Sequence, residues 1–146
     1  MYSDALQHIG QITIATRGKG LYDITREVSQ WVAAHASGVA LLTLFCRHTS
    51  ASLTIQENYD PDVIVDIKTF FEQLVPENPK IYTHTLEGPD DMPAHIRTVL
   101  SGVNLSIPVD HGRLTLGSWQ GIYLFEHRRN PHQRNVVLHL LAEEES

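Results

Sequence analysis

The sequence predicts a single α+β domain: a sandwich of mixed or antiparallel β-strands with about three helices. Two observations lead to this fold class. Helical periodicity is confined to the first two thirds of the chain, whereas the last third reads as short strands separated by turns. No strand–helix–strand regularity and no glycine-rich phosphate loop can be found in the sequence. The length of 146 residues fits one domain, which we assign to residues 1–146.

The first part of the chain predicts three strands and one helix. Residues 7–16 alternate as a strand does, and residues 23–35 carry the apolar stripe of a helix that ends at Gly38. Residues 39–46 are an unbroken apolar run, which is typical of a strand buried on both faces. Residues 51–56 predict the next strand.

A second helix is predicted from Pro61, with Asp60 as its N-cap and Pro76 beyond its end. We expect its apolar side chains to face the core: Val63, Ile64, Ile67, Phe70, Phe71 and Leu74. The remaining predicted elements are, in order, a short strand at 81–84, a helix at 92–102 and strands at 103–109, 113–116, 121–127 and 136–142.

Charge and composition exclude several classes of partner. The net charge is −6, and no basic stripe is present to replace the counterions of a nucleic acid. No apolar run approaches the ~20 residues of a membrane span, and the N-terminus lacks the pattern of a signal peptide. The single cysteine, Cys46, favours a reducing compartment, so we expect a cytoplasmic protein without nucleic-acid or membrane partners.

Three clusters place polar side chains where an ideal scaffold would not have them. The first is His48, Thr49 and Ser50, with Glu57 and Asn58 further on. The second is His84, Glu87, Asp90, Asp91 and His95. The third is Ser118, Trp119 and Gln120, enclosed by Gly117 and Gly121.

Each cluster has a structural and a functional interpretation. His48, His84 and His95 are either three hydrogen-bonded structural residues or the three ligands of a catalytic zinc ion, with carboxylates orienting the rings. One of Asp90 and Asp91 can cap a helix, which leaves the other to bind Mg²⁺ or to orient a histidine. The Trp119 segment is either a β-bulge or a surface for a flat heterocycle.

The same segments carry a resemblance to a known family. Residues 48–54 with 57–63, residues 87–96 and residues 117–128 resemble, in this order, three blocks of the YjbQ-like family. The resemblance implies a small α+β protein that forms trimers and has a secondary thiamine-phosphate synthase activity. That reaction joins a hydroxymethylpyrimidine diphosphate to a thiazole phosphate and releases diphosphate. It also implies a histidine-lined metal or anion site, which we place on His48, His84 and His95.

The leading functional hypothesis is therefore a thiamine-phosphate synthase-like transferase that acts on a small phosphorylated metabolite with a divalent metal, zinc or magnesium. The candidate catalytic carboxylates are Glu57, Asp91 and Glu126. The candidate substrate-binding residues are Thr49, Ser50, Asn58, Arg97, Trp119, Gln120 and Arg128. The alternatives are a zinc-dependent hydrolase of a small phosphorylated or amide metabolite, in which the metal lowers the pKa of a bound water, and a non-enzymatic trimeric metabolite-binding protein.

A homotrimer is also expected from the predicted strands. They carry more apolar surface than three short helices can cover, namely Leu105, Ile107, Val109, Leu114 and Leu116.

Overall fold

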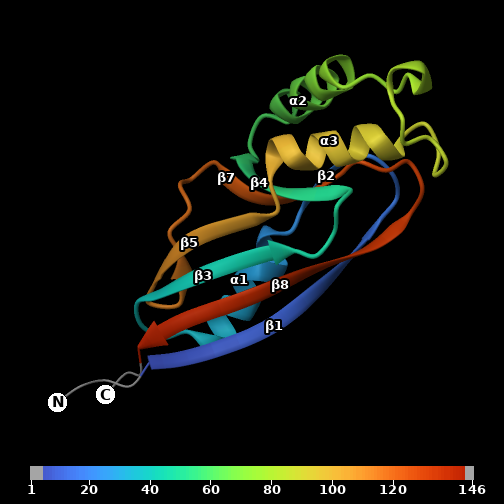
Figure 1. Cartoon of the computed structure of the whole chain (residues 1–146). Helices are drawn as coiled ribbons and strands as arrows, with labels where there is room; N and C mark the ends of the chain where they lie inside the picture. Colours follow the sequence, from blue (N-terminus) through green and yellow to red (C-terminus); the bar gives the residue numbers. More distant parts are fainter. Residues whose placement is uncertain (1–4, 144–146) are drawn as a thin grey trace.

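Two antiparallel sheets and three helices make up the fold in a computed structural model, which describes residues 5–143. The larger sheet has the order β1 (Ala5–Thr16), β8 (His132–Glu143), β3 (Ala40–Cys46), β5 (Asn104–Asp110), β6 (Arg113–Leu114). The smaller sheet has the order β2 (Gly20–Asp23), β7 (Gln120–Glu126), β4 (Ala51–Glu57). The helices are α1 (Thr25–His35), α2 (Pro61–Leu74) and α3 (Asp91–Ser101), with a 3-10 turn, η1, at Pro79–Ile81. The predicted α+β class is confirmed (Figure 1).

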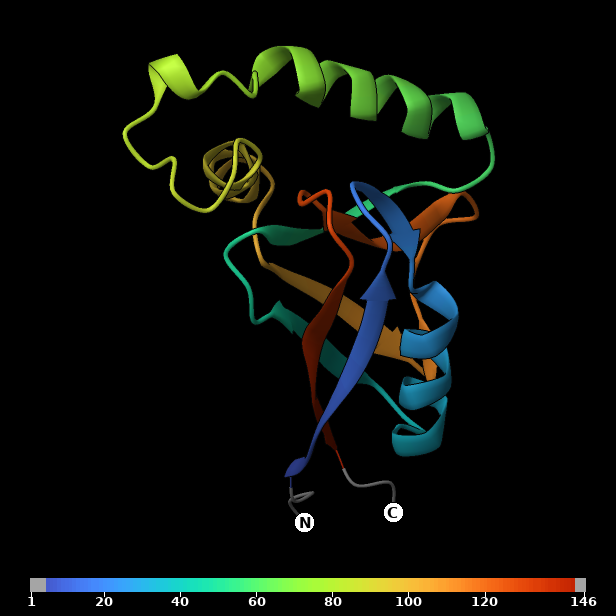
Figure 2. The ribbon, with the colours of Figure 1, turned by 90° about the vertical axis from the view of Figure 1, so that its right-hand side faces the viewer.

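The core lies between the two sheets and α1. Helix α1 runs along one face of the larger sheet (Figure 2) and buries Val28 and Val32 completely. Leu42 of β3, Leu124 of β7 and Leu138 of β8 are equally inaccessible. A single cluster of aliphatic side chains from both sheets therefore holds the fold together.

Strand β3 is buried on one face only, so the prediction of burial on both faces is wrong. Its residues alternate, with Leu42 and Leu44 in the core and with Leu41 and Phe45 42% and 49% exposed. The apolar run is explained by a second apolar face, which looks away from α1. Within the described chain nothing covers this outer face of the larger sheet.

Helix α2 is the second departure from the sequence analysis. It begins at Pro61 with Asp60 as its cap, as predicted, but none of its residues is buried. Phe70 and Leu74 are 58% and 52% exposed. In Figure 2, α2 lies at the end of the molecule, above α3 and away from the core between the sheets. Its apolar stripe thus has the right period, but it does not face the main core.

Other elements differ in detail. Residues 81–84 are not a strand, because Pro79 begins a 3-10 turn that ends at Ile81 and a loop follows. Strand β2 was not predicted. The apolar surplus expected on the late strands is absent, because Ile107 and Val109 are buried and Leu105, Leu114 and Leu116 pack against the core. Among residues 5–143, no helix is long and apolar enough to cross a membrane.

Candidate metal centre

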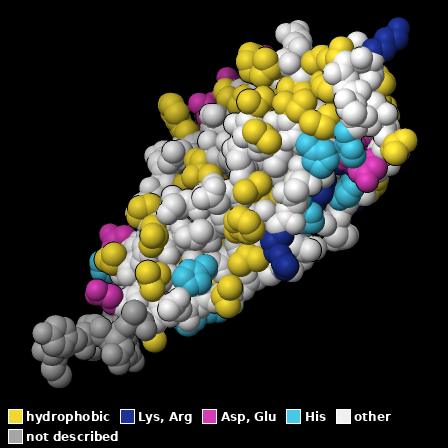
Figure 3. Space-filling view, viewed as in Figure 1, with side chains coloured by type: hydrophobic (Ala, Val, Ile, Leu, Met, Phe, Trp, Pro, Cys, Tyr) yellow, Lys and Arg dark blue, Asp and Glu magenta, His cyan; other side chains and the backbone are white. Residues whose placement is uncertain are grey.

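Four side chains that could bind a metal ion meet where the loop before α3 joins that helix. They are His84, Glu87, Asp91 and His95, and one ligand atom from each lies within 4.8 Å of all the others. Asp91 and His95 are four residues apart on α3, so both side chains project from one face of the helix. Figure 3 shows histidine and acidic side chains gathered at this end of the molecule.

The hydrogen bonds of His95 fix which of its nitrogens is available. Nδ1 lies 2.9 Å from the carbonyl oxygen of Thr49, which can only accept, so Nδ1 carries a proton. In the neutral ring Nε2 then has a lone pair, and it lies 3.0 Å from Oδ2 of Asp91. His84 directs its own Nε2 at the same oxygen, at 2.6 Å.

This arrangement favours a cation at the centre. Two atoms that both carry lone pairs face each other at His95 and Asp91, so a proton or a metal ion must lie between them. A histidine that donates its other N–H to a backbone carbonyl is the usual support of a metal ligand. The cluster therefore has both the ligand set and the orienting hydrogen bond of a metal centre.

Arg128 holds the carboxylates in place from the opposite side. Its Nη1 donates to Oδ1 of Asp91 at 2.5 Å, and its Nε donates to Oδ2 of Asp90 at 3.0 Å. Burial alone would raise the pKa of Asp91, but hydrogen bonding from His84 and the nearby positive charges outweigh it, so the pKa lies below its usual value. Asp91 is thus ionised, with Oδ2 directed at the histidines, and Arg128 acts in this structure as a positioning residue.

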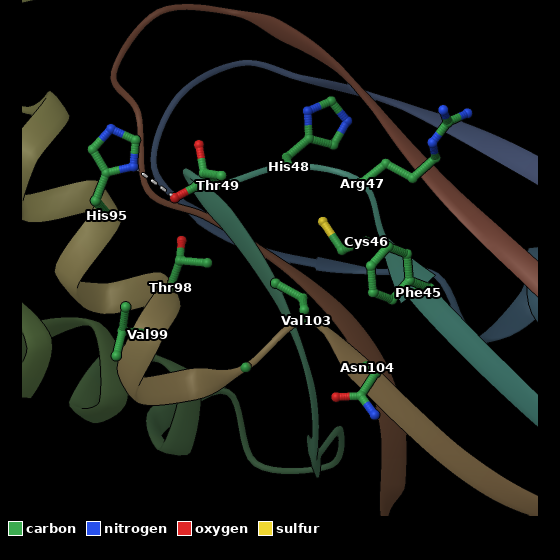
Figure 4. A pocket seen from close by; sticks show the side chains of 11 residues that line it. Phe45, Cys46, Arg47, His48, Thr49, His95, Thr98, Val99, Val103 and Asn104 are labelled. Carbon is green, nitrogen blue, oxygen red and sulfur yellow. Dashed lines mark hydrogen bonds between the residues drawn. The ribbon is translucent and has the colours of Figure 1, made fainter.

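His48 does not join the cluster, which corrects the predicted set of three histidines. Its Nε2 accepts the backbone N–H of Asn135 at 2.8 Å, and its Nδ1 lies 3.4 Å from Nη1 of Arg134. Burial, together with the charge of Arg134, lowers the pKa of His48, so the ring is neutral at pH 7. The lone pair of Nε2 is already used, and the ring lies on the other side of Thr49 from His95 (Figure 4). Among the described residues, the group that could hold a metal ion consists of two histidines and two carboxylates and does not include His48.

A pocket of about 860 Å³ adjoins the cluster through His95. Its walls are largely apolar and include Phe45 of β3, Val99 of α3 and Val103, which follows α3. Thr49 and His95 line it together, joined by the hydrogen bond drawn in Figure 4. The pocket can take the apolar or ring portion of a small molecule whose polar group reaches the cluster.

The third polar cluster, around Trp119, lies elsewhere. Strands β4 and β7 pair antiparallel, with Ala51 opposite Glu126 at one end and Glu57 opposite Gln120 at the other. The cluster lies near the first end, and Trp119 lies near the second, ~20 Å away along a strand of seven residues. One chain therefore does not bring Glu57, Asn58, Trp119 and Gln120 to the cluster.

The residues at that far end support a turn. Trp119 stacks on Tyr59, with ring centroids 5.9 Å apart. The side chain of Gln120 accepts the N–H of Gly117 at 2.8 Å, and Asn58 donates its backbone N–H to the carbonyl of Trp119. Their predicted roles in substrate binding stay predictions that require a second chain or a separate ligand.

Glu126 and Ser50 lie in the interior rather than on the pocket wall. Glu126 is fully buried, and its two oxygens accept hydrogen bonds from Nε and Nη2 of Arg134 at 2.7 and 2.5 Å and from Thr16 at 2.6 Å. Arg134 also donates to Oγ of Ser50. Arg134 was not among the predicted site residues, because its partners come from β7 and from the turn before β4, which no local sequence pattern brings together. The fully paired carboxylate of Glu126 suits a supporting role better than a catalytic one.

Arg97, the predicted phosphate ligand, also faces inward. It is 2% exposed, and its Nη2 donates to the backbone carbonyl of Val75 at 2.8 Å. It lies on the side of α3 that is turned toward α2, whereas the cluster occupies another face of the same helix.

Comparison with known proteins decides the family. Residues 10–143 match the family described as UPF0047 protein YjbQ-like. The chain belongs to this family. Among curated UPF0047 proteins, one from Synechocystis sp. is 50% identical over 137 residues, covering 94% of this chain and 93% of its own length. The UPF0047 protein YjbQ of Escherichia coli O157:H7 is 41% identical, covering 90% and 96%.

Solved structures of UPF0047 relatives share the fold. A YjbQ/UPF0047 protein from Clostridium acetobutylicum is 35% identical with a TM-score of 0.80, covering 88% of this chain and 96% of its own. A protein from Sulfolobus solfataricus, described as YbjQ-like and of unknown function, has a TM-score of 0.87 at 23% identity, covering 96% and 100%. At this low identity, the similarity to the Sulfolobus solfataricus protein shows a shared fold and nothing about function.

Proposed function

We propose that this UPF0047 protein is a metal-dependent enzyme whose divalent metal is held by His84, Asp91 and His95. The observation that carries the proposal is the lone pair of His95 Nε2, which faces the carboxylate of Asp91 while Nδ1 donates to Thr49. Two imidazoles and one carboxylate are a donor set of catalytic zinc sites, which keep a fourth position open. Magnesium prefers an all-oxygen set, so we propose zinc or a similar transition metal.

The chemistry that fits this site best is hydrolysis of a small phosphorylated or amide metabolite. A bound metal supplies a polarised substrate oxygen and a water of lowered pKa. Glu87 is exposed, and its Oε2 lies 3.6 Å from Nε2 of His84, so its carboxylate can take the proton of that water. The adjoining pocket holds the apolar portion of the substrate. A cytoplasmic location, which the single cysteine favours, is part of this proposal.

Thiamine-phosphate synthase-like transfer is the second candidate. The observation that favours it is the largely apolar pocket of about 860 Å³ beside the cluster, which has room for a heterocyclic ring close to a metal that neutralises a leaving diphosphate. Trp119 and Arg97, the expected ring and phosphate contacts, do not reach this pocket in one chain. The hydrolytic candidate therefore stands first.

One pair of assays distinguishes the two reactions. Purified protein is given hydroxymethylpyrimidine diphosphate with and without thiazole phosphate, and released phosphate and diphosphate are measured. Diphosphate release that depends on thiazole phosphate supports the transferase. Release of phosphate or diphosphate without it supports the hydrolase, and no release in either assay contradicts both reactions for this substrate.

The ligand assignment is tested by metal content. We expect about one zinc per chain, with most of it lost in His84→Ala, Asp91→Ala and His95→Ala, and with little further loss in double variants, because the ligands act as a unit. The matched control is His111→Ala, since His111 is an exposed histidine paired with Asp110 at 2.7 Å. His48→Ala should also retain the metal. Emission spectroscopy gives the content, and loss in His48→Ala alone would restore the original histidine set.

A further inference from the structure

A second, smaller cavity lies on the other side of α3 from the metal cluster. It measures about 20 Å³ and is enclosed between α2, the start of β2, the end of β7 and α3. The cationic residues that line it are Lys19, Lys68 and Arg97. A cavity of this size holds one water molecule or one monatomic ion.

Arg97 has an unused donor at this cavity. Its side chain is 2% exposed, and Nη2 is bonded to the carbonyl of Val75. Nε of Arg97 is the one buried side-chain nitrogen or oxygen without a hydrogen-bond partner among the described residues. A buried N–H without a partner costs about 1–3 kcal/mol, so an unpaired donor here indicates a bound species that accepts a hydrogen bond.

The carboxylates nearby are already paired. Glu72 binds Lys19 at 2.6 Å and its Oε2 also lies 3.5 Å from Nη2 of Arg97, which leaves Nε as the buried nitrogen of Arg97 without a partner. Glu77 binds the same lysine at 2.7 Å and also pairs with Arg129. Glu126, on the cavity wall, is paired with Arg134.

Lys68 is different. Its Nζ lies close to Gly20 at the cavity, and Lys68 has no ion pair within residues 5–143. The exposed ammonium of Lys68 and the buried, unpaired N–H of Arg97 therefore line the same small space. An anion there would accept the hydrogen bond of Arg97 and be attracted by the charge of Lys68.

We propose that this cavity binds a small inorganic anion of chloride size, held by Nε of Arg97 and the ammonium of Lys68. Its place in the fold gives the site a role. Helix α2 buries no residue of its own and is joined to the rest of the fold by contacts around this cavity: Lys19 before β2 with Glu72, Arg97 of α3 with Val75, and Phe71 against Phe125 of β7. An anion between Lys68 of α2 and Arg97 of α3 adds one more bridge, so the anion fastens α2 to α3.

The neighbouring histidine supports a positive field in the cavity. His127 lines the same wall, and its pKa is lowered to about 3, first by burial and then by the charges of Arg97, Arg134 and Lys19. The ring is therefore neutral at pH 7 and does not compete with the anion as a further charge.

The test combines diffraction with thermal unfolding. Crystals are soaked in sodium bromide, and bromide is located by its anomalous signal. In parallel, the melting temperature is measured in sodium chloride and in sodium gluconate at equal ionic strength. We expect bromide beside Nε of Arg97, and a melting temperature that rises in chloride and saturates, because a ligand of the native state alone stabilises it by mass action.

The variant that tests the site is Lys68→Met, which removes the ammonium and leaves the buried Arg97 in place. It should lose the chloride dependence, whereas Lys80→Met, at an exposed lysine of η1 outside the cavity, should keep it. A water molecule at the site in bromide-soaked crystals overturns the proposal. Bromide density without any chloride-dependent melting means an adventitious ion only and overturns it as well.

Discussion

Three charged side chains show at the residue scale how a candidate ligand and its support can come from different sequence blocks. Asp91 offers one oxygen to His84 and His95 and the other to Arg128. Arg128 is bound on three sides, by Asp90, Asp91 and the carbonyl of Glu87. Glu126, two residues earlier, is fully enclosed with Arg134. The sequence predicted a functional role for all three residues. Only their contacts in the structure show that Asp91 is a candidate metal ligand, whereas Arg128 and Glu126 have supporting roles.

Glu126 gives a prediction at this scale. Glu126→Ala leaves the guanidinium of Arg134 buried without its partner, and breaking such a pair costs about 3–5 kcal/mol of unfolding free energy. Urea unfolding measures the loss, and Glu57→Ala, at a partly buried glutamate, should change stability by less than about 1 kcal/mol. The folded fraction of Glu126→Ala should keep its metal. Normal stability with lost turnover would instead make Glu126 a catalytic residue.

At the scale of elements, hydrophobic periodicity predicted where helices lie but not what covers them. Helices α1 and α2 carry equally clear apolar stripes, yet α1 buries Val28 and Val32 and α2 buries nothing. An apolar stripe predicts which face of a helix is removed from water, but it does not predict which part of the protein covers that face. The strand predicted at residues 81–84 is absent for a different reason. Pro79, with Asn78 as its cap, starts a 3-10 turn that ends at Ile81, so this segment does not pair as a strand.

A chain of hydrogen bonds joins three elements around His127. Nε2 of His127 lies 2.9 Å from the hydroxyl of Ser52 on β4, which lies 2.6 Å from the hydroxyl of Ser101 on α3. The Ser101 hydroxyl is also 2.6 Å from the carbonyl of Arg97, which must accept its proton. The donors therefore run in one direction, from His127 to Ser52 to Ser101, and His127 carries its proton on Nε2.

This chain predicts a pH dependence of stability. The folded pKa of His127 is lowered to about 3 from the ordinary 6.5, so between these values the unfolded chain binds a proton that the folded chain does not. Stability is full above pH 6.5 and falls by about 1.4 kcal/mol per pH unit as the pH drops through this window. His127→Gln keeps a donor for Ser52 but does not titrate. Chemical unfolding at several pH values should therefore give a shallower acid loss for the variant, and identical slopes would contradict the buried neutral ring.

At the scale of the whole molecule, the site could be predicted in part. Asp91 and His95 are four residues apart on one helix, so their meeting follows from local geometry. His84 joins them from a loop only seven residues away. The position of His48 depends on how Asn135 of β8 pairs with the turn after β3, which no local pattern contains. Trp119 and the cluster lie at opposite ends of the pair formed by β4 and β7. The order of residues in the sequence does not show at which end of a strand pair a site will form.

The outer face of the larger sheet is the other feature of the whole molecule. Ile9, Leu41, Phe45 and Leu141 are 74%, 42%, 49% and 45% exposed on β1, β3 and β8. Figure 3 shows hydrophobic side chains spread over this face, which Figure 1 presents to the viewer. An apolar area of this kind on a sheet of four long strands is typical of an interface. The sequence analysis expected a neighbouring subunit to cover the late strands, whose apolar residues turn out to pack in the core. The outer face of the larger sheet is the apolar surface that such a subunit could cover instead.

We predict a homotrimer at micromolar concentration, assembled through this face. The resemblance in the sequence implies a trimer, and the uncovered side chains of β1, β3 and β8 offer the surface. Sedimentation equilibrium should give three times the chain mass of 16.5 kDa. Leu41→Lys places a charge on this face, opposite Leu141 in the strand pairing, and should shift the mass toward the monomer, because burying an unpaired charge is costly. Leu86→Lys, at a leucine that is 99% exposed in the loop before α3, should remain trimeric. A wild-type mass of one chain would contradict the prediction, and a trimer unaffected by Leu41→Lys would move the interface to the exposed face of α2.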